Sequence, residues 1–205
     1  MKKKVGIMGG SFDPIHMGHL VAANEALNIY KLDEIIFIPT GDPPHKDYPN
    51  AESFHRLLMV NMAVLTNDKF SVSDIEIKNP SKSYTLSTLR ELHKLYKNTE
   101  FYFITGTDAV LNLPSWHQPE EVLKLCRFIA ATRPGISIEE VNTKINEIKR
   151  MFGGNIEILQ VPMLQISSSD IRNRIKMGVS IKYLLPDSVE QYIIKNSLYK
   201  NGQEK

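Results

Sequence analysis

Short apolar runs alternate with amphipathic segments along this chain, and this alternation restricts the fold more than any other feature. Runs rich in β-branched and aromatic residues, which are typical of strands, lie at residues 4–9, 34–40, 70–77, 100–106, 127–132 and 156–161. Segments with helical spacing of apolar residues lie at 18–31, 53–66, 85–97, 119–126, 138–151, 168–177 and 187–196. A strand and a helix about every 30 residues predict βαβ units with parallel strands, and hence an α/β fold.

The composition fits one globular domain. The chain has 205 residues, of which 42% are hydrophobic and 23% are charged, and this is enough for a substantial core. The formal net charge of +2 is too small for a general nucleic-acid binder, but it is compatible with a local basic pocket for phosphates. We therefore expect no nucleic-acid partner.

Cysteine use and hydropathy indicate the compartment. Cys126 is the single cysteine, so it cannot form a disulfide within the chain, as is usual in a reducing cytoplasm. It lies in an apolar run and is expected in the core rather than as a nucleophile. No segment approaches the roughly 20 apolar residues of a membrane span, and the basic start lacks the apolar centre of a signal peptide. We expect a cytoplasmic protein with no membrane partner.

Serines and polar loops mark the ends of several elements. Ser53 and Ser137 are expected to cap the helices that follow them. The longest loops are expected at 40–52 and 78–84. In an open parallel α/β sheet, loops at the carboxyl ends of the strands bind ligands, and the informative motifs fall in such loops.

The stretch "GGSFDPIHMGHL" at residues 9–20 follows the first expected strand. Gly9 and Gly10 end that strand, where a ligand could approach the main chain without meeting a Cβ atom. The stretch lacks the G-x-G-x-x-G pattern of dinucleotide-binding oxidoreductases and the G-x-x-x-x-G-K-[ST] pattern of a P-loop. Neither of those two phosphate-binding loops is therefore expected.

Two histidines stand at the helix start within this stretch. His16 and His19 are at i and i+3, with Gly18 between them, so they occupy neighbouring positions of the first turn. Such a turn has unpaired N–H groups and the positive end of the helix dipole, which attract phosphate, and two imidazoles can add donors. A zinc site would need a third ligand, for which only Asp13 is close, and ordinary surface histidines are the other alternative. Phosphate binding is the favoured interpretation.

A second helix start, rich in hydroxyl groups, is the stretch "ISSSDIRNRIK" from residue 166. Ser167, Ser168 or Ser169 could cap this helix, with Asp170 in its first turn. Arg172 lies one turn inside, where its guanidinium could bind a phosphate held at the helix terminus. The alternative is a capped helix without a ligand.

Two loops after expected strands carry basic residues. The stretch "GDPPHKDYP" places His45 and Lys46 after the second strand, and "TRPG" places Arg133 after the fifth. A lysine in a polar loop is usually only solvated. Both loops, however, follow the ends of strands at which open α/β sheets bind ligands.

Two of these stretches carry a family resemblance. "GGSFDPIHMGH" resembles the G-x-F-D-P-x-H-x-G-H signature of the nucleotidyltransferase superfamily with the H-x-G-H motif, and "ISSSDIR" resembles its second signature. Their order and wide separation make the pair specific. The resemblance implies catalytic roles for His16, His19, Lys46 and Arg172. It also implies an ATP site formed by Gly9, Gly10, Ser11, Phe12, His16, His19, Arg133, Ser168, Ser169 and Arg172.

Three further stretches narrow the resemblance. "SYTLSTL", "GTDAVLNLPSW" and the "PPHK" loop are similar to those of bacterial nicotinate-nucleotide adenylyltransferases, which join ATP and nicotinate mononucleotide into nicotinate adenine dinucleotide and release pyrophosphate in NAD biosynthesis. The resemblance implies a Rossmann-like doubly wound, mainly parallel sheet with a small helical C-terminal extension. It also implies a single nucleotidyltransferase domain, 1–205, with 167–205 as its helical C-terminal part.

The same resemblance implies a site for nicotinate mononucleotide. Its expected residues are His45, Lys46, Tyr84, Thr85, Gly106, Asp108 and Trp116. Thr85, beside a helix N-terminus, could donate to the nicotinate carboxylate; Trp116 could stack on the cationic ring; and Asp108 could accept from ribose hydroxyls. The alternatives are core packing for Trp116 and helix capping for Asp108. His117 stands where the family often has an aromatic residue.

The implied chemistry needs no general base, because the phosphate of the acceptor is already a charged nucleophile at neutral pH. Mg²⁺ is the implied cofactor, bound through the phosphates of ATP and not by protein side chains. The expected partners are ATP and nicotinate mononucleotide, and a homo-oligomer is compatible with the sequence. The alternatives are nicotinamide mononucleotide or phosphopantetheine as the acceptor, or a catalytically silent nucleotide-sensing regulator.

Overall fold

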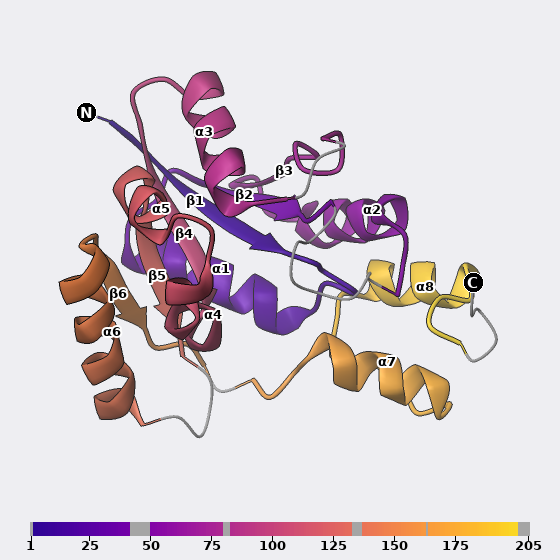
Figure 1. Cartoon of the computed structure of the whole chain (residues 1–205). Coiled ribbons are helices and arrows are strands. Elements are labelled where there is room, and N and C mark those ends of the chain that lie inside the picture. The colour runs from indigo at the N-terminus through magenta and orange to yellow at the C-terminus, as the bar shows by residue number, and fades with distance from the viewer. Residues whose placement is uncertain (1, 42–49, 80–82, 133–136, 163, 201–205) are drawn as a thin grey trace.

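The structure is a computed structural model and describes residues 2–41, 50–79, 83–132, 137–162 and 164–200. Within this part of the chain, six strands form one sheet in the order β3-β2-β1-β4-β5-β6, and all neighbouring strands are parallel (Figure 1). The strands are β1 (Lys3–Gly10), β2 (Glu34–Pro39), β3 (Phe70–Val72), β4 (Thr99–Gly106), β5 (Arg127–Ala131) and β6 (Ile156–Leu159). This is the strand order of a doubly wound Rossmann-type sheet, so the predicted fold class is confirmed.

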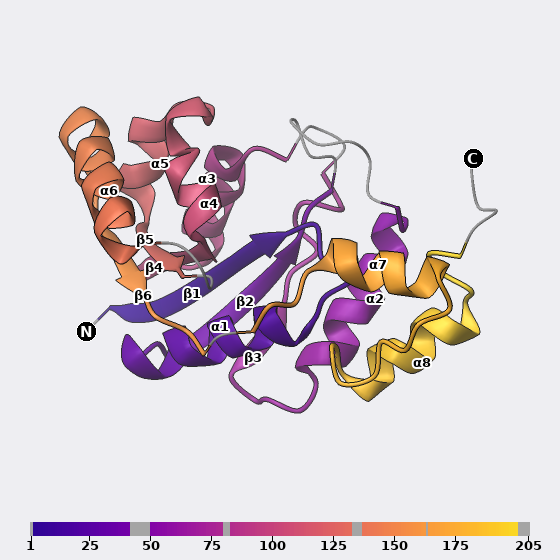
Figure 2. The ribbon, with the colours of Figure 1, turned by 90° about the horizontal axis from the view of Figure 1, so that it is seen from below.

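Helices cover both faces of this sheet, as Figure 2 shows. One face packs against α1 (Met17–Ile29), α2 (Ser53–Val64), α7 (Ser168–Lys176) and α8 (Asp187–Lys195). The other packs against α3 (Thr85–Leu95), α4 (Thr107–Leu111), α5 (Pro119–Leu125) and α6 (Ile138–Phe152), with a short 3-10 helix, η1 (Leu113–Ser115), after α4. The expected C-terminal extension is thus the pair α7 and α8.

The two faces of the sheet have separate apolar cores, because successive side chains of a strand point to opposite faces. In β1, Met8 belongs to the core beneath α1 and α2, whereas Val5 and Ile7 belong to the core beneath α3 to α6. Ile171 of α7 and Val189 of α8 are fully buried in the same core as Met8. This shared core supports the expectation of a single domain over 1–205, which stays a prediction.

Two predicted boundaries were wrong because tertiary contacts override local signals. Ser53 does not cap α2: Glu52 is its N-cap, since the main chain at Ala51 is fixed from elsewhere in the fold. The third strand ends at Val72 rather than at residue 77, because the chain turns there and the Lys78 N–H donates to the Asp74 carbonyl. Asp and Asn favour such turns over strand ladders.

The expectations for Ser137 and Cys126 were confirmed. Ser137 caps α6 by accepting from the Glu140 N–H at 3.4 Å. Cys126 is buried in the core, and burial raises the pKa of its thiol far above the ordinary value, so it stays neutral. Among the described residues, no helix is both long and apolar enough to span a bilayer.

Candidate active site

A cavity of about 230 Å³ opens where β1 and β4 end. From β1 the chain winds outward to β2 and β3, and then crosses back to β4 and winds the other way. Neighbouring loops therefore diverge at this switch point, and the crevice between them is where such sheets bind ligands. Of the residues predicted from the sequence, those that line the cavity are Gly9, Gly10, Ser11, Phe12, His16, His19, Gly106 and Asp108.

The two histidines form the wall at the start of α1. His16 is the N-cap, with extended backbone, and His19 is the third helical residue. The His16 N–H donates to Nδ1 of His19 at 3.2 Å, and the two rings stack with centroids 3.8 Å apart. Because a backbone N–H can only donate, Nδ1 of His19 must be the acceptor, and the neutral ring then carries its proton on Nε2. In this tautomer the hydrogen of the His19 ring is on Nε2.

The glycine between the histidines makes room for the His16 ring. A Cβ atom at Gly18 would lie 3.0 Å from both Cε1 and Nδ1 of His16, which is tighter than ordinary van der Waals contact. The His16 side chain is itself 5% exposed, so it has little space to move aside. Gly18 is thus needed for the position of the neighbouring imidazole.

Replacing Gly18 by alanine should lower turnover on the order of tenfold, because the added methyl group displaces the His16 ring. The melting temperature should change little, since the higher helix propensity of alanine, worth about 1 kcal/mol, offsets part of the strain. Steady-state kinetics and a thermal melt of the same preparation check this. Wild-type turnover in Gly18→Ala would show that the site does not depend on this gap.

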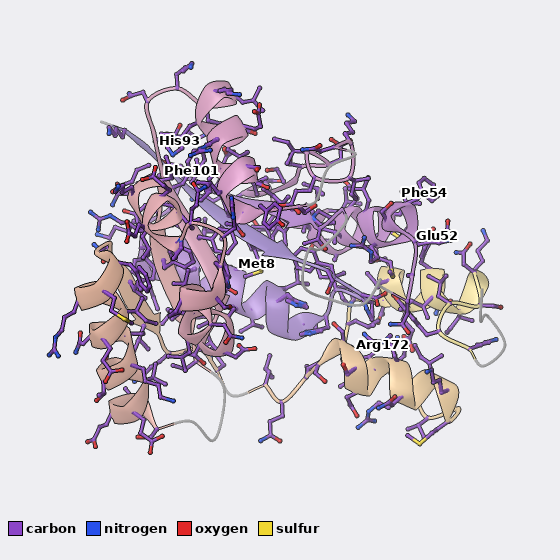
Figure 3. All side chains as sticks on the ribbon, viewed as in Figure 1. Met8, Glu52, Phe54, His93, Phe101 and Arg172 are labelled. Carbon is purple, nitrogen blue, oxygen red and sulfur yellow. The ribbon has the colours of Figure 1, made fainter. Side chains whose placement is uncertain are left out.

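The start of α7 holds the loop that precedes His16. Ser168 Oγ donates to the Pro14 carbonyl at 2.9 Å, and Arg172 Nη1 donates to the Asp13 carbonyl at 2.7 Å. Arg172, labelled on α7 in Figure 3, also donates to Ser169 Oγ at 3.4 Å. Since a guanidinium carries five N–H donors, these two bonds leave capacity for a phosphate oxygen. The two signature stretches therefore meet in space.

The three serines before Arg172 have different roles in the fold. Ser167 is the N-cap of α7, and its Oγ accepts from the Asp170 N–H at 3.1 Å. Ser168 uses its hydroxyl on the Pro14 carbonyl, and the Ser169 side chain is exposed. Ser168 and Ser169 are the first two residues of the helix, whose N–H groups face the helix N-terminus.

Arg56 of α2 is a buried residue that sequence reasoning missed. Its side chain is 1% exposed and donates to three main-chain carbonyls: Ser11 at 2.7 Å, Thr40 at 2.7 Å and Ala51 at 3.2 Å. Burial lowers the pKa of this guanidinium, and the carboxylate of Asp13 opposes that shift. Arg56 thereby joins the loop after β1 to the end of β2 and the start of α2. A lone arginine among the apolar residues of 53–66 was the available signal.

The residues expected around nicotinate mononucleotide lie in two groups. Gly106 and Asp108 line the cavity, with Asp108 in the first turn of α4 and Gly106 as its N-cap. Tyr84 is the N-cap of α3 and Thr85 its first residue; the Tyr84 ring lies 5.0 Å from that of His117, between centroids. Neither Tyr84 nor Thr85 lines the cavity.

Trp116 follows η1 and is half-buried. Its ring makes edge contacts with Phe103 and Phe128, with centroids 6.1 Å and 6.0 Å away. It packs against the core on the α3 to α6 face and is not part of the cavity wall. The Trp116 side chain is therefore partly packed against the core and partly exposed to solvent.

Some expected residues have no described placement, and some lining residues were not expected. His45, Lys46 and Arg133 lie outside the described residues. Thr132 after β5, and Val161 and other apolar residues after β6, also line the cavity. Their place after the carboxyl ends of strands was the sequence feature that could have identified them as lining residues.

Comparison with known proteins agrees with this geometry. A family model described as cytidylyltransferase-like matches residues 7–174. Curated proteins from Thermoanaerobacter sp. (strain X514) and Desulfitobacterium hafniense (strain Y51) are each 48% identical to this chain. The matches cover 98% and 97% of this chain and 96% of each relative, and both are named "Probable nicotinate-nucleotide adenylyltransferase". The chain belongs to the nicotinate-nucleotide adenylyltransferase family.

Solved structures place the fold in the same family. A nicotinic acid mononucleotide adenylyltransferase of Plasmodium falciparum, complexed with NaAD, matches with a TM-score of 0.79 and 26% identity. The match covers 96% of this chain and 97% of that one. The same enzyme complexed with APC matches with a TM-score of 0.76. The cavity at the switch point is therefore the candidate active site of this member of the family.

Proposed function

We infer that this protein is an enzyme that transfers the adenylyl group of ATP to nicotinate mononucleotide, producing nicotinate adenine dinucleotide and pyrophosphate in NAD biosynthesis. The observation that carries this is the meeting of two helix N-termini, those of α1 and α7, beside one cavity. Arg172 and Ser168 connect them by bonds to the Asp13 and Pro14 carbonyls. Helix N-termini with added N–H donors favour anions, and a dinucleotide synthesis brings two phosphate-bearing substrates together.

The adenylyl donor is proposed to lie against the start of α1. Gly9 and Gly10, the last two residues of β1, would let the polyphosphate approach the main chain there, and Ser11 and Phe12 follow in the loop. His16, His19, Ser168, Ser169, Arg133 and Arg172 are the proposed donors to ATP. The Nε2–H of His19 would bond most strongly when negative charge develops on the phosphate oxygens in the transition state.

The main obstacle to this reaction is repulsion between two anions. The phosphate of nicotinate mononucleotide attacks the α-phosphorus of ATP, and one pair of unit charges 4 Å apart costs about 4 kcal/mol at an effective dielectric of 20. No base is required, because a phosphate monoester has a second pKa near 6. We propose that His16, His19, Lys46 and Arg172 offset the repulsion, so that catalysis is positioning plus charge stabilisation.

Mg²⁺ is the proposed cofactor. The imidazole, hydroxyl and guanidinium groups beside the two helix starts suit phosphate oxygens better than a hard cation. The carboxylates nearby already have partners: Asp13 accepts from the Ala51 N–H and the Tyr199 hydroxyl, and Asp170 accepts from Arg174. The metal would therefore be held by the phosphates of ATP, where it supplies positive charge during transfer. ATP and nicotinate mononucleotide are the proposed partners, and the cytoplasm is the proposed compartment.

The acceptor is proposed to lie between the start of α3 and the start of α4. Thr85, at a helix N-terminus, would bond the nicotinate carboxylate, and the exposed part of Trp116 would stack on the cationic ring. Asp108, exposed at the cavity, would accept from ribose hydroxyls. His45, Lys46, Tyr84 and Gly106 complete the proposed set.

ATP that is isotopically labelled at one phosphorus shows which phosphorus is attacked. With ATP labelled at its α-phosphorus, the label should appear in the dinucleotide; with ATP labelled at its γ-phosphorus, it should appear in pyrophosphate. Both products should form in equal amounts. Recovery of the γ-label in the nucleotide product would contradict adenylyl transfer, because another phosphorus would then have been attacked.

A further inference from the structure

We propose that Tyr199, in the C-terminal segment after α8, is a positioning residue for the transfer reaction and acts through Asp13 on the loop that carries His16. This rests on the function proposed above. Tyr199 lies beyond both signature stretches and beyond residues 7–174, the part of the chain that matches the family model. Nothing in its local sequence, "SLYKNG", indicates a role in the site.

The contact is a buried hydrogen bond between distant parts of the chain. The Tyr199 hydroxyl donates to Asp13 Oδ1 at 2.9 Å. The two residues are 6% and 3% exposed. Burial, and secondarily the charge of Asp13, raises the pKa of the Tyr199 phenol far above its ordinary value. The hydroxyl therefore keeps its proton and remains a donor to the carboxylate.

Asp13 also contacts residues of the candidate site, so it connects Tyr199 to them. Its carboxylate also accepts from the main-chain N–H groups of Asn50 at 2.8 Å and Ala51 at 3.0 Å. Its Oδ2 lies 3.7 Å from Nη1 of Arg172, and its carbonyl accepts from that same nitrogen. Asp13 is three positions before His16, the N-cap of α1. A rotation of the Asp13 carboxylate would therefore shift both Arg172 and the loop that leads to His16.

The backbone at and just before Tyr199 adopts a conformation that is rare for residues other than glycine. Ser197 and Tyr199 have φ angles of 53° and 66°, in the left-handed region that non-glycine residues rarely adopt. Together they turn the chain after Lys195, the last residue of α8, so that the Tyr199 ring enters the core. Such conformations persist where surrounding contacts hold them, and the bond to Asp13 is one of those contacts.

The test compares two tyrosine-to-phenylalanine changes, which keep the ring and remove only the hydroxyl. Tyr199→Phe should lower kcat on the order of tenfold, with a smaller change in KM for ATP, because the donors of the site are misplaced. Tyr192→Phe is the matched control: Tyr192 lies on α8, and its hydroxyl bonds Nδ1 of His55 on α2 at 2.8 Å instead of Asp13. It should lose a hydrogen bond but keep wild-type kcat.

A double-mutant cycle separates positioning from general stability. In an Asp13→Asn background, which removes the charged acceptor, Tyr199→Phe should change kcat much less than in the wild type. All proteins are assayed well below their lowest melting midpoint, so that unfolding does not enter the rate. Wild-type kcat in Tyr199→Phe, or equal effects in both backgrounds, would overturn the proposal. A wild-type protein without turnover would instead contradict the proposed function.

Discussion

Replacing His19 by alanine should lower turnover by about 100- to 1,000-fold while the fold is retained. The change removes the Nε2–H donor at the start of α1, and loss of one such donor to a transition state has an effect of this size. It also removes Nδ1, which accepts from the His16 N–H, so about 1 kcal/mol of stability should be lost with the helix cap. Pyrophosphate release at saturating substrates and a thermal melt measure the two effects.

Three further variants separate the two roles of this ring. An asparagine amide can occupy the place of Nδ1, and a glutamine amide the place of Nε2, so His19→Asn should regain stability and His19→Gln should regain part of the turnover. His93→Ala is the control, since His93 bonds the Leu125 carbonyl and contacts Phe101, well separated from Arg172 in Figure 3. Normal turnover in His19→Ala would contradict the assignment of the phosphate site.

Replacing Arg56 by methionine should lower the free energy of unfolding by at least about 3 kcal/mol. Methionine fills much of the same volume but leaves the carbonyls of Ala51, which is buried, and of Ser11 and Thr40, which are half-buried, without this donor. Each such loss costs about 1–3 kcal/mol, and Asp13 also loses a nearby positive charge. Because the Ser11 carbonyl belongs to the loop of the proposed ATP site, KM for ATP should rise as well. Denaturant unfolding and steady-state kinetics check both.

Arg127→Met is the matched control for this change. The Arg127 side chain is 42% exposed and pairs with Glu100 at 2.7 Å near the edge of the sheet. Exposed ion pairs contribute about 1 kcal/mol or less, so this variant should be only slightly destabilised and should keep its KM for ATP. Equal losses of stability in the two variants would show that the carbonyls of Ser11, Thr40 and Ala51 do not depend on Arg56.

The sequence was sufficient for the parts of the site that depend on neighbours along the chain. His16 and His19 share one helical turn, so their spacing alone placed both side chains at a helix start. The alternation of strands and helices predicted a parallel sheet, and the carboxyl-end rule predicted that ligands bind at the loops after the strands, where the cavity lies. Both features depend on residues that are close in the sequence, and the structure has both the helix start and the parallel sheet.

The parts that sequence reasoning missed depend on contacts between distant residues. Arg56 donates a hydrogen bond to the Ser11 carbonyl, and Tyr199 donates one to Asp13. The spacing of apolar residues along the chain does not reveal such long-range pairs. Helix capping was the alternative for Asp108, but α4 begins one residue earlier, at Thr107, and Gly106 is its N-cap. The start of α2 is set by hydrogen bonds at Ala51 and not by the serine that follows.

The most direct measurement is pyrophosphate release from ATP and Mg²⁺ with three acceptors offered in parallel: nicotinate mononucleotide, nicotinamide mononucleotide and phosphopantetheine. We expect release with a strong preference for nicotinate mononucleotide, because the proposed site offers N–H and O–H donors to its carboxylate. Equal use of both pyridine nucleotides would contradict that selectivity, and release only with phosphopantetheine would contradict the substrate. Release with none of the three would contradict the enzyme itself and favour a nucleotide-sensing regulator.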